Sequence, residues 1–314
     1  MRTVSSWVAP ATRWQDVTDG DAFLARLVES GRLLITLQPA PEERTPTHCF
    51  RVGPEYRIWQ PEVGGAVFTE DRPELLLQPL AGSNRARFEK MVWRSWLPAI
   101  YPIWKRQVIH ASAVASLAGD VIVFSGPSGA CKSTTAYGLT RRDKWTLVAD
   151  DALAFSCPSD ENLEPIALHP LRRFVRLRQA TAHHFGKSRA GEVAFEWPRV
   201  PLRLRAIYTL DSNSDLSTPV GFSRLGAGEG FQLLLLQAFA MSLLETQHNQ
   251  RLMRDYLSLA ASVPMFRFTF PKSFDLLESN LDQLERHAGA NGVQTDLLAP
   301  AGAACTTGLE GAPR

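Results

Sequence analysis

The sequence predicts an α/β protein whose main domain has a mixed sheet and follows a smaller N-terminal α+β region. The first observation is a buried strand at 121–124 that passes through a Gly/Pro/Ser loop into a helix beginning at Lys132. The second is a set of segments predicted to be strands; these are the apolar run 145–156 and the segments 171–179 and 204–211. The third is that helical patterns follow these runs, at 231–244 and 249–263, as expected when helices cover a sheet.

Residues 1–104 are expected to form the N-terminal α+β region. The segment 49–59 predicts two short strands turned by Gly53-Pro54. The segment 87–107 is predicted to be helical until Pro98 ends it. Its aromatic side chains are interpreted as packing groups that tie this region to the next.

The main domain is expected over residues 105–288. Segments 108–116 and 120–125 predict a hairpin turned around Gly119-Asp120 that leads into the Gly/Pro/Ser loop. Near the end of the domain, residues 265–270 alternate and so place three phenylalanines on one face of a strand.

The C-terminal end of the chain is expected to change from helix to disorder. Residues 273–287 predict an amphipathic helix capped by Ser273. Residues 289–314 are rich in Gly and Ala without periodicity and are predicted to be a disordered tail.

The Gly/Pro/Ser loop has the features of a phosphate-binding loop. A strand, a glycine-rich loop and a helix opening with Lys-Ser allow backbone N–H groups and the helix dipole to hold nucleotide phosphates. The pattern begins at Gly126, but Cys131 stands where the second glycine of G-x-x-x-x-G-K-[ST] belongs. A non-glycine residue costs on the order of 1 kcal/mol there if the loop needs a positive φ. The alternative is an ordinary β-to-α turn with a surface lysine.

These features predict a nucleotide site that takes ATP and Mg²⁺. Lys132 is expected to contact the β- and γ-phosphates, and the Ser133 hydroxyl to bind Mg²⁺. The predicted nucleotide-binding residues are Gly126, Pro127, Ser128, Gly129, Ala130, Cys131, Lys132, Ser133 and Thr134.

Two adjacent carboxylates, Asp150 and Asp151, end the apolar run that follows the loop. Phosphoryl-transfer enzymes use such acids to hold Mg²⁺ and to accept the proton of the attacking hydroxyl. Because neighbouring residues on a strand face opposite ways, only one should meet the nucleophile. We assign Asp150 as the base and Asp151 to the metal. A solvated Asp-Asp turn is the alternative.

Four basic side chains near residue 175 are open to two interpretations. Arg172, Arg176 and Arg178 share a strand face with Phe174, and Arg173 lies opposite. They either lie along a solvent-exposed edge of the sheet or bind phosphate or an acidic peptide.

Three segments together carry a resemblance to a known family: IHASAVA, VIVFSGPSGACKSTT and LVADDALAF. Their order resembles the C-terminal domain of the HPr kinase/phosphorylase family, and more closely the HPr kinase-like proteins of lasso-peptide and other ribosomal-peptide gene clusters. The resemblance covers residues 105–287 and implies the nucleotide-binding fold of HPr kinase and phosphoenolpyruvate carboxykinase. It implies that His110, otherwise a structural histidine, lies near the transferred phosphate as a catalytic residue with Lys132 and Asp150. Relatives assemble, so a homo-oligomer is also implied.

The chain departs from that family after the aspartate pair. The family's Glu-Arg-Gly signature is absent, and HPLRRFVRL stands at 169–177 instead. We therefore expect neither dephosphorylation nor HPr as the substrate.

Composition sets the remaining expectations. A net charge of +2 gives no general attraction to nucleic acid or membranes. The four cysteines lack disulfide or metal spacing and no apolar leader is visible, so we expect a cytoplasmic protein. The predicted activity is a kinase for a serine-type hydroxyl on a peptide or small protein, for instance a lasso-type precursor. The alternatives are a kinase for free serine or a similar small molecule, and a binding module without catalysis.

Overall fold

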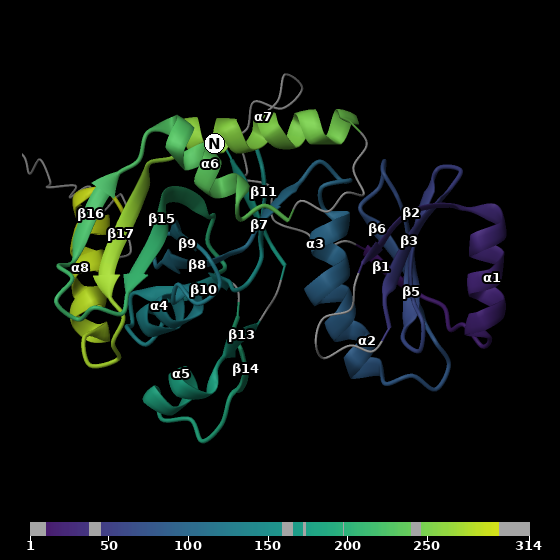
Figure 1. Ribbon diagram of the computed structural model, residues 1–314, viewed down its shortest axis with the longest axis horizontal. Coiled ribbons are helices and arrows are strands. Elements are labelled where there is room, and N and C mark those ends of the chain that lie inside the picture. The colour runs from purple at the N-terminus through teal and green to yellow at the C-terminus, as the bar shows by residue number, and fades with distance from the viewer. Residues whose placement is uncertain are drawn as a thin grey trace, which may run out of the picture.

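The N-terminal region forms a six-stranded sheet in the order β1-β6-β5-β4-β3-β2 (Figure 1). The computed structural model describes residues 11–37, 45–158, 166–171, 174–196, 198–239 and 246–294. All neighbouring strands of this sheet are antiparallel except β1 and β6. The strands are β1 Ala11–Trp14, β2 Arg32–Leu37, β3 Thr47–Val52, β4 Glu55–Gln60, β5 Gly64–Thr69 and β6 Glu74–Pro79. Gly53-Pro54 makes the predicted turn between β3 and β4, with Gly53 at φ 60°.

Helices cover both faces of this sheet, as an α+β region requires. Helix α1 (Gly20–Ser30) is capped by the Asp19 side chain and buries Leu27 against Phe50 and Trp59. The opposite face packs on the helical segment 85–100, whose Phe88 and Trp96 are fully buried.

The prediction that Pro98 ends this helix is wrong. The segment consists of α2 (Arg85–Met91), a π-helical turn (Val92–Trp96) and α3 (Leu97–Ile100). The Leu97 N–H bonds to the Val92 carbonyl, so the wide turn restarts the helix immediately before the proline. Pro98 then lies in the first turn of α3, where a missing N–H costs nothing.

The main domain is built on a mixed six-stranded sheet in the order β10-β8-β9-β15-β17-β16. The central strands β9, β15 and β17 are parallel, and the outer pairs are antiparallel. The strands are β8 Ala111–Ser116, β9 Asp120–Ser125, β10 Trp145–Ala149, β15 Arg203–Asn213, β16 Gly221–Arg224 and β17 Met265–Pro271. The predicted α/β class and mixed sheet are confirmed, and β8 and β9 form the predicted hairpin.

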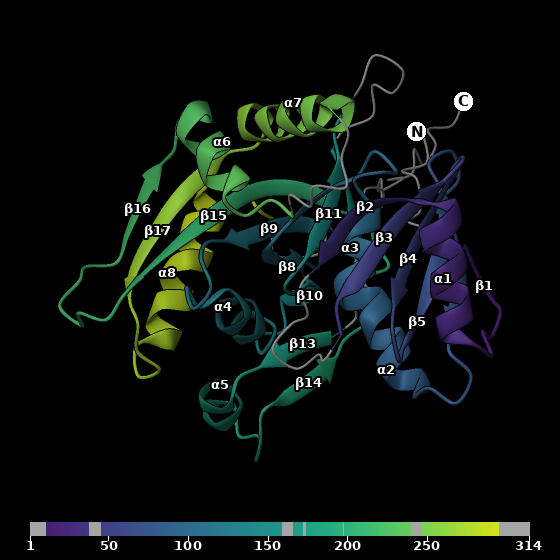
Figure 2. The same cartoon turned by 45° about the vertical axis from the view of Figure 1, so that its right-hand side comes forward.

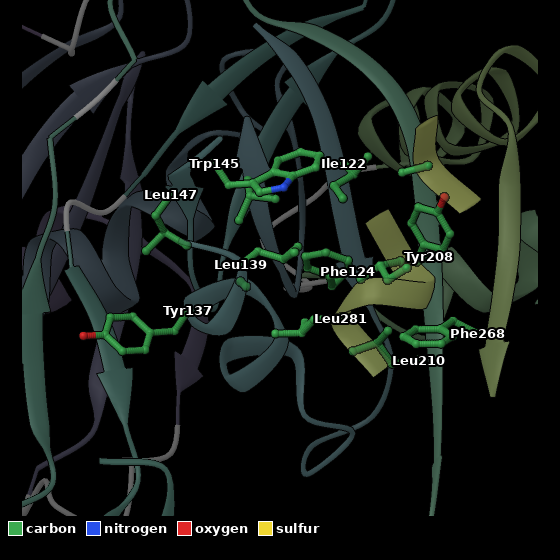
Figure 3. Close-up of a cluster of buried hydrophobic side chains, with 14 of the residues drawn as sticks. Ile122, Phe124, Tyr137, Leu139, Trp145, Leu147, Tyr208, Leu210, Phe268 and Leu281 are labelled. Carbon is green, nitrogen blue, oxygen red and sulfur yellow. The ribbon is translucent and has the colours of Figure 1, made fainter. Parts of the chain in front are cut away.

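Two pairs of helices cover the two faces of this sheet (Figure 2). Helices α4 (Lys132–Leu139) and α8 (Leu277–Ala290) bury apolar side chains on one face, together with Phe266, Phe268 and Phe270 as predicted. Figure 3 shows part of this core, around Phe124 and Leu281. Helices α6 (Ala227–Leu235) and α7 (Thr246–Ser262) cover the other face.

Two apolar runs predicted as continuous strands pass from one sheet to another. The run 108–116 divides into β7 (Gln107–Ile109) and β8, and the run 145–156 divides into β10 and β11 (Leu153–Ser156). β7 and β11 join β12 (Ala167–Pro170) in a separate three-stranded sheet. His110 lies at the first division, and Asp150 and Asp151 lie at the second.

A small strand–helix–strand segment follows this three-stranded sheet. β13 (Phe174–Leu177) pairs with β14 (Gly191–Ala194), and α5 (Gln179–His184) lies between them. Figures 1 and 2 show α5 beside α4. Arg172 and Arg173, which belonged to the predicted strand, lie outside the described residues.

The C-terminal helices differ from prediction at their ends. α6 stops at Leu235, and the end of the predicted helix at 240–244 lies outside the described residues. α8 begins at Leu277 without a side-chain cap, because Ser273 instead accepts a hydrogen bond from the Asp275 N–H in the preceding loop. α8 continues to Ala290 and Val293 is buried, so the predicted tail begins too early; residues 295–314 lie outside the described residues.

Gly119, in the turn between β8 and β9, provides a test of this hairpin. It has φ 83°, and a Cβ there would lie 2.2 Å from the Pro201 carbonyl oxygen. Gly119→Ala is predicted to lower the free energy of unfolding by roughly 3 kcal/mol, because it adds left-handed strain to an overpacked contact. Gly129→Ala is the matched control: its φ is 87° but no atom lies within 4 Å, so only about 1 kcal/mol should be lost. Chemical denaturation measures both; equal losses would contradict the packing.

No helix in the described part of the chain is long and apolar enough to cross a membrane.

Candidate functional site

The loop between β9 and α4 has the backbone conformation that its glycine pattern predicts. Gly126 has φ 137°, and a Cβ there would lie 3.1 Å from the Leu210 carbonyl oxygen of β15. Gly129 and Cys131 also have positive φ, 87° and 70°. The loop therefore turns tightly against the sheet before α4 begins at Lys132.

Cys131 occupies the left-handed position where the phosphate-loop pattern has its second glycine. It precedes the first residue of α4 and makes no side-chain capping bond. Burial raises the pKa of its thiol above the ordinary value, while Lys272 and Arg178 oppose that rise. The side chain is therefore a small group packed against the core at a left-handed position that favours glycine.

Substitutions at Cys131 test its left-handed conformation. Cys131→Gly is predicted to raise the free energy of unfolding by about 1 kcal/mol or less, because glycine removes the left-handed penalty but adds chain entropy to the unfolded state. Cys131→Val should lower it by more than about 1 kcal/mol, because a β-branched residue is poorly tolerated at positive φ. Urea titration of the pair measures the difference; a valine variant as stable as the glycine variant would contradict the assigned conformation.

Lys132 lies inside the loop rather than on the surface. Its side-chain ammonium donates to the carbonyl oxygens of Gly126 at 2.6 Å and Pro127 at 3.1 Å, and the residue is 7% exposed. Burial lowers the pKa of the ammonium, while the negative charges of Asp151 and Asp150 oppose this. The lysine is therefore a buried group near two negative charges and not a surface side chain, and phosphate binding by this loop stays a prediction.

Asp150 lies at the end of β10 and is 2% exposed. Its Oδ1 accepts from the Ser112 hydroxyl at 2.7 Å and its Oδ2 from the Arg176 backbone N–H at 3.1 Å, and Ser133 is a third partner. Burial raises the pKa of this carboxyl, and these hydrogen bonds oppose the rise. Asp150 therefore joins the end of β10 to Ser133, the residue predicted to bind metal.

Asp151 points to different surroundings. It has φ 67°, and its carboxylate lies 3.2 Å from Nε2 of His110. Both side chains are partly exposed, 42% for Asp151 and 33% for His110. The two divided strands therefore bring the predicted histidine and a carboxylate together where both reach solvent.

Two cations from outside the loop pattern also contact the loop. Nη2 of Arg178 lies 3.4 Å from the Ser128 hydroxyl, and Nζ of Lys272 donates to the Gly129 carbonyl at 3.0 Å. Sequence analysis raised Arg178 but missed Lys272. Lys272 directly follows β17, whose end shares a sheet edge with the phosphate loop because β9, β15 and β17 are parallel. That signal depends on strand order and could be used only once the topology was known.

The residues present fit Mg²⁺ held together with a nucleotide. Within the described ranges no group of three His, Cys, Asp or Glu side chains could hold a metal ion alone. Mg²⁺ is usually bound by one or two carboxylates together with substrate phosphates. The half-buried Ser133 hydroxyl, a hydrogen-bond partner of the buried Asp150 carboxylate, forms such a partial donor set with it.

Comparison of the chain with protein-family models and with curated proteins gave no match. Among solved structures, the chain is similar to the Hpr(Ser) kinase/phosphatase from Coxiella burnetii. The TM-score is 0.28 and the sequence identity 12%, over 59% of this chain and 93% of that chain.

Proposed function

We propose that the protein is an ATP- and Mg²⁺-dependent kinase that transfers the γ-phosphoryl group to a serine-type hydroxyl of a peptide or small protein. The observation that carries this proposal is the meeting of three features: the loop with its buried lysine, the Ser133–Asp150 contact and the exposed Asp151–His110 pair. Glycine-rich loops with a lysine hold nucleotide phosphates, and adjoining acids serve the metal and the attacking group.

We also propose that the two aspartates exchange the roles assigned from sequence. Asp150 contacts Ser133 and is buried with both oxygens engaged, which suits a group on the metal side. A base must reach the substrate hydroxyl, and Asp151 is the carboxylate with exposed surface. His110, at 3.2 Å, holds the Asp151 carboxylate in one orientation.

In the proposed transfer, Asp151, Lys132 and the amides at the start of α4 act on the reacting groups. The acceptor hydroxyl oxygen attacks the γ-phosphorus, its proton passes to the Asp151 carboxylate, and the bond from the γ-phosphorus to the β–γ bridging oxygen breaks to release ADP. Lys132 and the amides at the start of α4 stabilise the negative charge on the phosphates. Mg²⁺ bound near Ser133 and Asp150 would neutralise further phosphate charge.

The experiment that tests the function uses radiolabelled ATP with Mg²⁺. The intact protein is incubated with an array of serine- and threonine-containing peptides, including ribosomal-peptide precursors, and in parallel with free serine. Label on peptides supports the proposal, whereas label on free serine alone supports a small-molecule kinase. Nucleotide binding without transfer to any acceptor would favour the binding module.

A further inference from the structure

A pair of exposed aromatic side chains lies close to the phosphate loop and has no part in the proposed chemistry. The rings of His184, at the end of α5, and Phe274, in the loop before α8, stack with centroids 4.7 Å apart and an interplanar angle of 20°. His184 is exposed and Phe274 is 36% exposed. A stacked pair open to solvent offers an outer aromatic face on which a planar ligand can stack.

The pair is held in place by packing on α4. Phe185, which follows His184, packs edge-on against Tyr137 with ring centroids 5.0 Å apart. A Cβ at Gly138 would lie 2.8 Å from Leu281 of α8 and 3.6 Å from Phe185. Helices α4, α5 and α8 therefore meet closely around Gly138, and this contact fixes the segments that carry both aromatic rings.

Two contacts place the pair beside the phosphate loop. Thr181, three residues before His184, shares a 3.1 Å hydrogen bond with Thr134 in the first turn of α4. Lys272, two residues before Phe274, donates to the Gly129 carbonyl. The two aromatic rings thus come from segments that each touch the phosphate loop or the start of α4.

The expected orientation of a bound nucleotide follows from the positions of the phosphate loop and the two aspartates. In a phosphate loop the amides hold the α- and β-phosphates, and the lysine and metal are at the β- and γ-phosphates. The γ end should therefore lie toward Asp150 and Asp151, at the division between β10 and β11. The nucleoside end should then lie away from it, and Figures 1 and 2 show α8 to the left of α4 and α5 below it, with β11 up and to the right.

We propose that the His184–Phe274 pair is the nucleobase site, where the purine ring of the bound nucleotide stacks on the exposed aromatic surface. This inference rests on the proposed nucleotide-binding function and adds the part of the ligand that the phosphate loop does not recognise. Stacking on aromatic side chains accepts any purine, because every base offers a flat π face.

Isothermal titration with two ligands tests the inference: MgATP, and magnesium tripolyphosphate, which has the phosphates but no base. Phe274→Ala and His184→Ala are each expected to weaken MgATP binding by about tenfold while tripolyphosphate binding is unchanged. Phe274→Trp should keep MgATP affinity. Leu257→Ala is the matched control, since it truncates another exposed apolar side chain, 48% exposed on α7.

The outcomes separate this inference from the function on which it rests. If both alanine variants bind MgATP as well as the unmodified protein does, or lose the two ligands equally, the base site is overturned while the phosphate site stands. If the unmodified protein binds neither ligand, the proposed function fails and the base site fails with it. Selective loss of MgATP affinity supports both.

Discussion

Asp151→Asn is expected to slow phosphoryl transfer by about 10²- to 10⁴-fold while nucleotide affinity stays unchanged. The reason is that an amide cannot accept the proton of the attacking hydroxyl, and general base catalysis contributes on that scale. Asp151 is partly exposed and its carboxylate pairs with His110, so the variant should keep the fold. Transfer of radiolabelled phosphate to the best peptide acceptor measures the rate, and titration with MgATP measures affinity.

Asp150→Asn is the matched comparison, because it makes the same chemical change at the adjacent position. Asp150 is buried against Ser133, so its variant should require more Mg²⁺ for activity and should recover part of its rate as Mg²⁺ is raised. Asp151→Asn should not recover with Mg²⁺. Full transfer by Asp151→Asn, together with complete loss in Asp150→Asn at all Mg²⁺ concentrations, would return the base to Asp150.

Lys132→Met is expected to reduce transfer by about 10²- to 10³-fold and to weaken MgATP binding. The ammonium is the charged donor inside the loop, and loss of one such donor to developing negative charge has an effect of this size. Methionine keeps the buried aliphatic volume of a residue that is 7% exposed. Titration calorimetry and the radiolabel assay measure the two effects.

A surface lysine supplies the control for that change. Lys105 is exposed in the turn that follows α3, and Lys105→Met removes the same charge outside the loop. It should leave binding and transfer unchanged. Equal effects of the two methionine variants would show that net charge alone governs nucleotide affinity, and the role given to Lys132 would then be wrong.

The sequence predicted the centre of the fold because its signals there are local. The strand at 121–124, the loop from Gly126 and the helix start at Lys132 depend on neighbouring residues only, and all are present in the structure. The Gly53-Pro54 turn is a similar case. The prediction that Pro98 ends the helix failed because a π-helical turn precedes it. That turn lets a new helix, α3, begin at Leu97, so the missing N–H of Pro98 falls in a first turn where no partner is needed.

The different surroundings of Asp150 and Asp151 could not be predicted from strand alternation. Alternation assumes a continuous strand, but the chain leaves β10 at Asp150 and turns at Asp151 with φ 67°. The division depends on pairing with two different sheets, which involves strands far apart in the sequence. The same is true of Lys272, which reaches the phosphate loop across 143 residues of sequence.

A crystal structure of the protein with Mg²⁺ and a non-hydrolysable ATP analogue tests the central claim most directly. The account predicts the β-phosphate within hydrogen-bond distance of the amides at 129–133, and Mg²⁺ beside Ser133 and Asp150. It further predicts the γ-phosphate on the side of Asp151 and His110. A nucleotide bound elsewhere, or a metal held away from both Ser133 and Asp150, would contradict it.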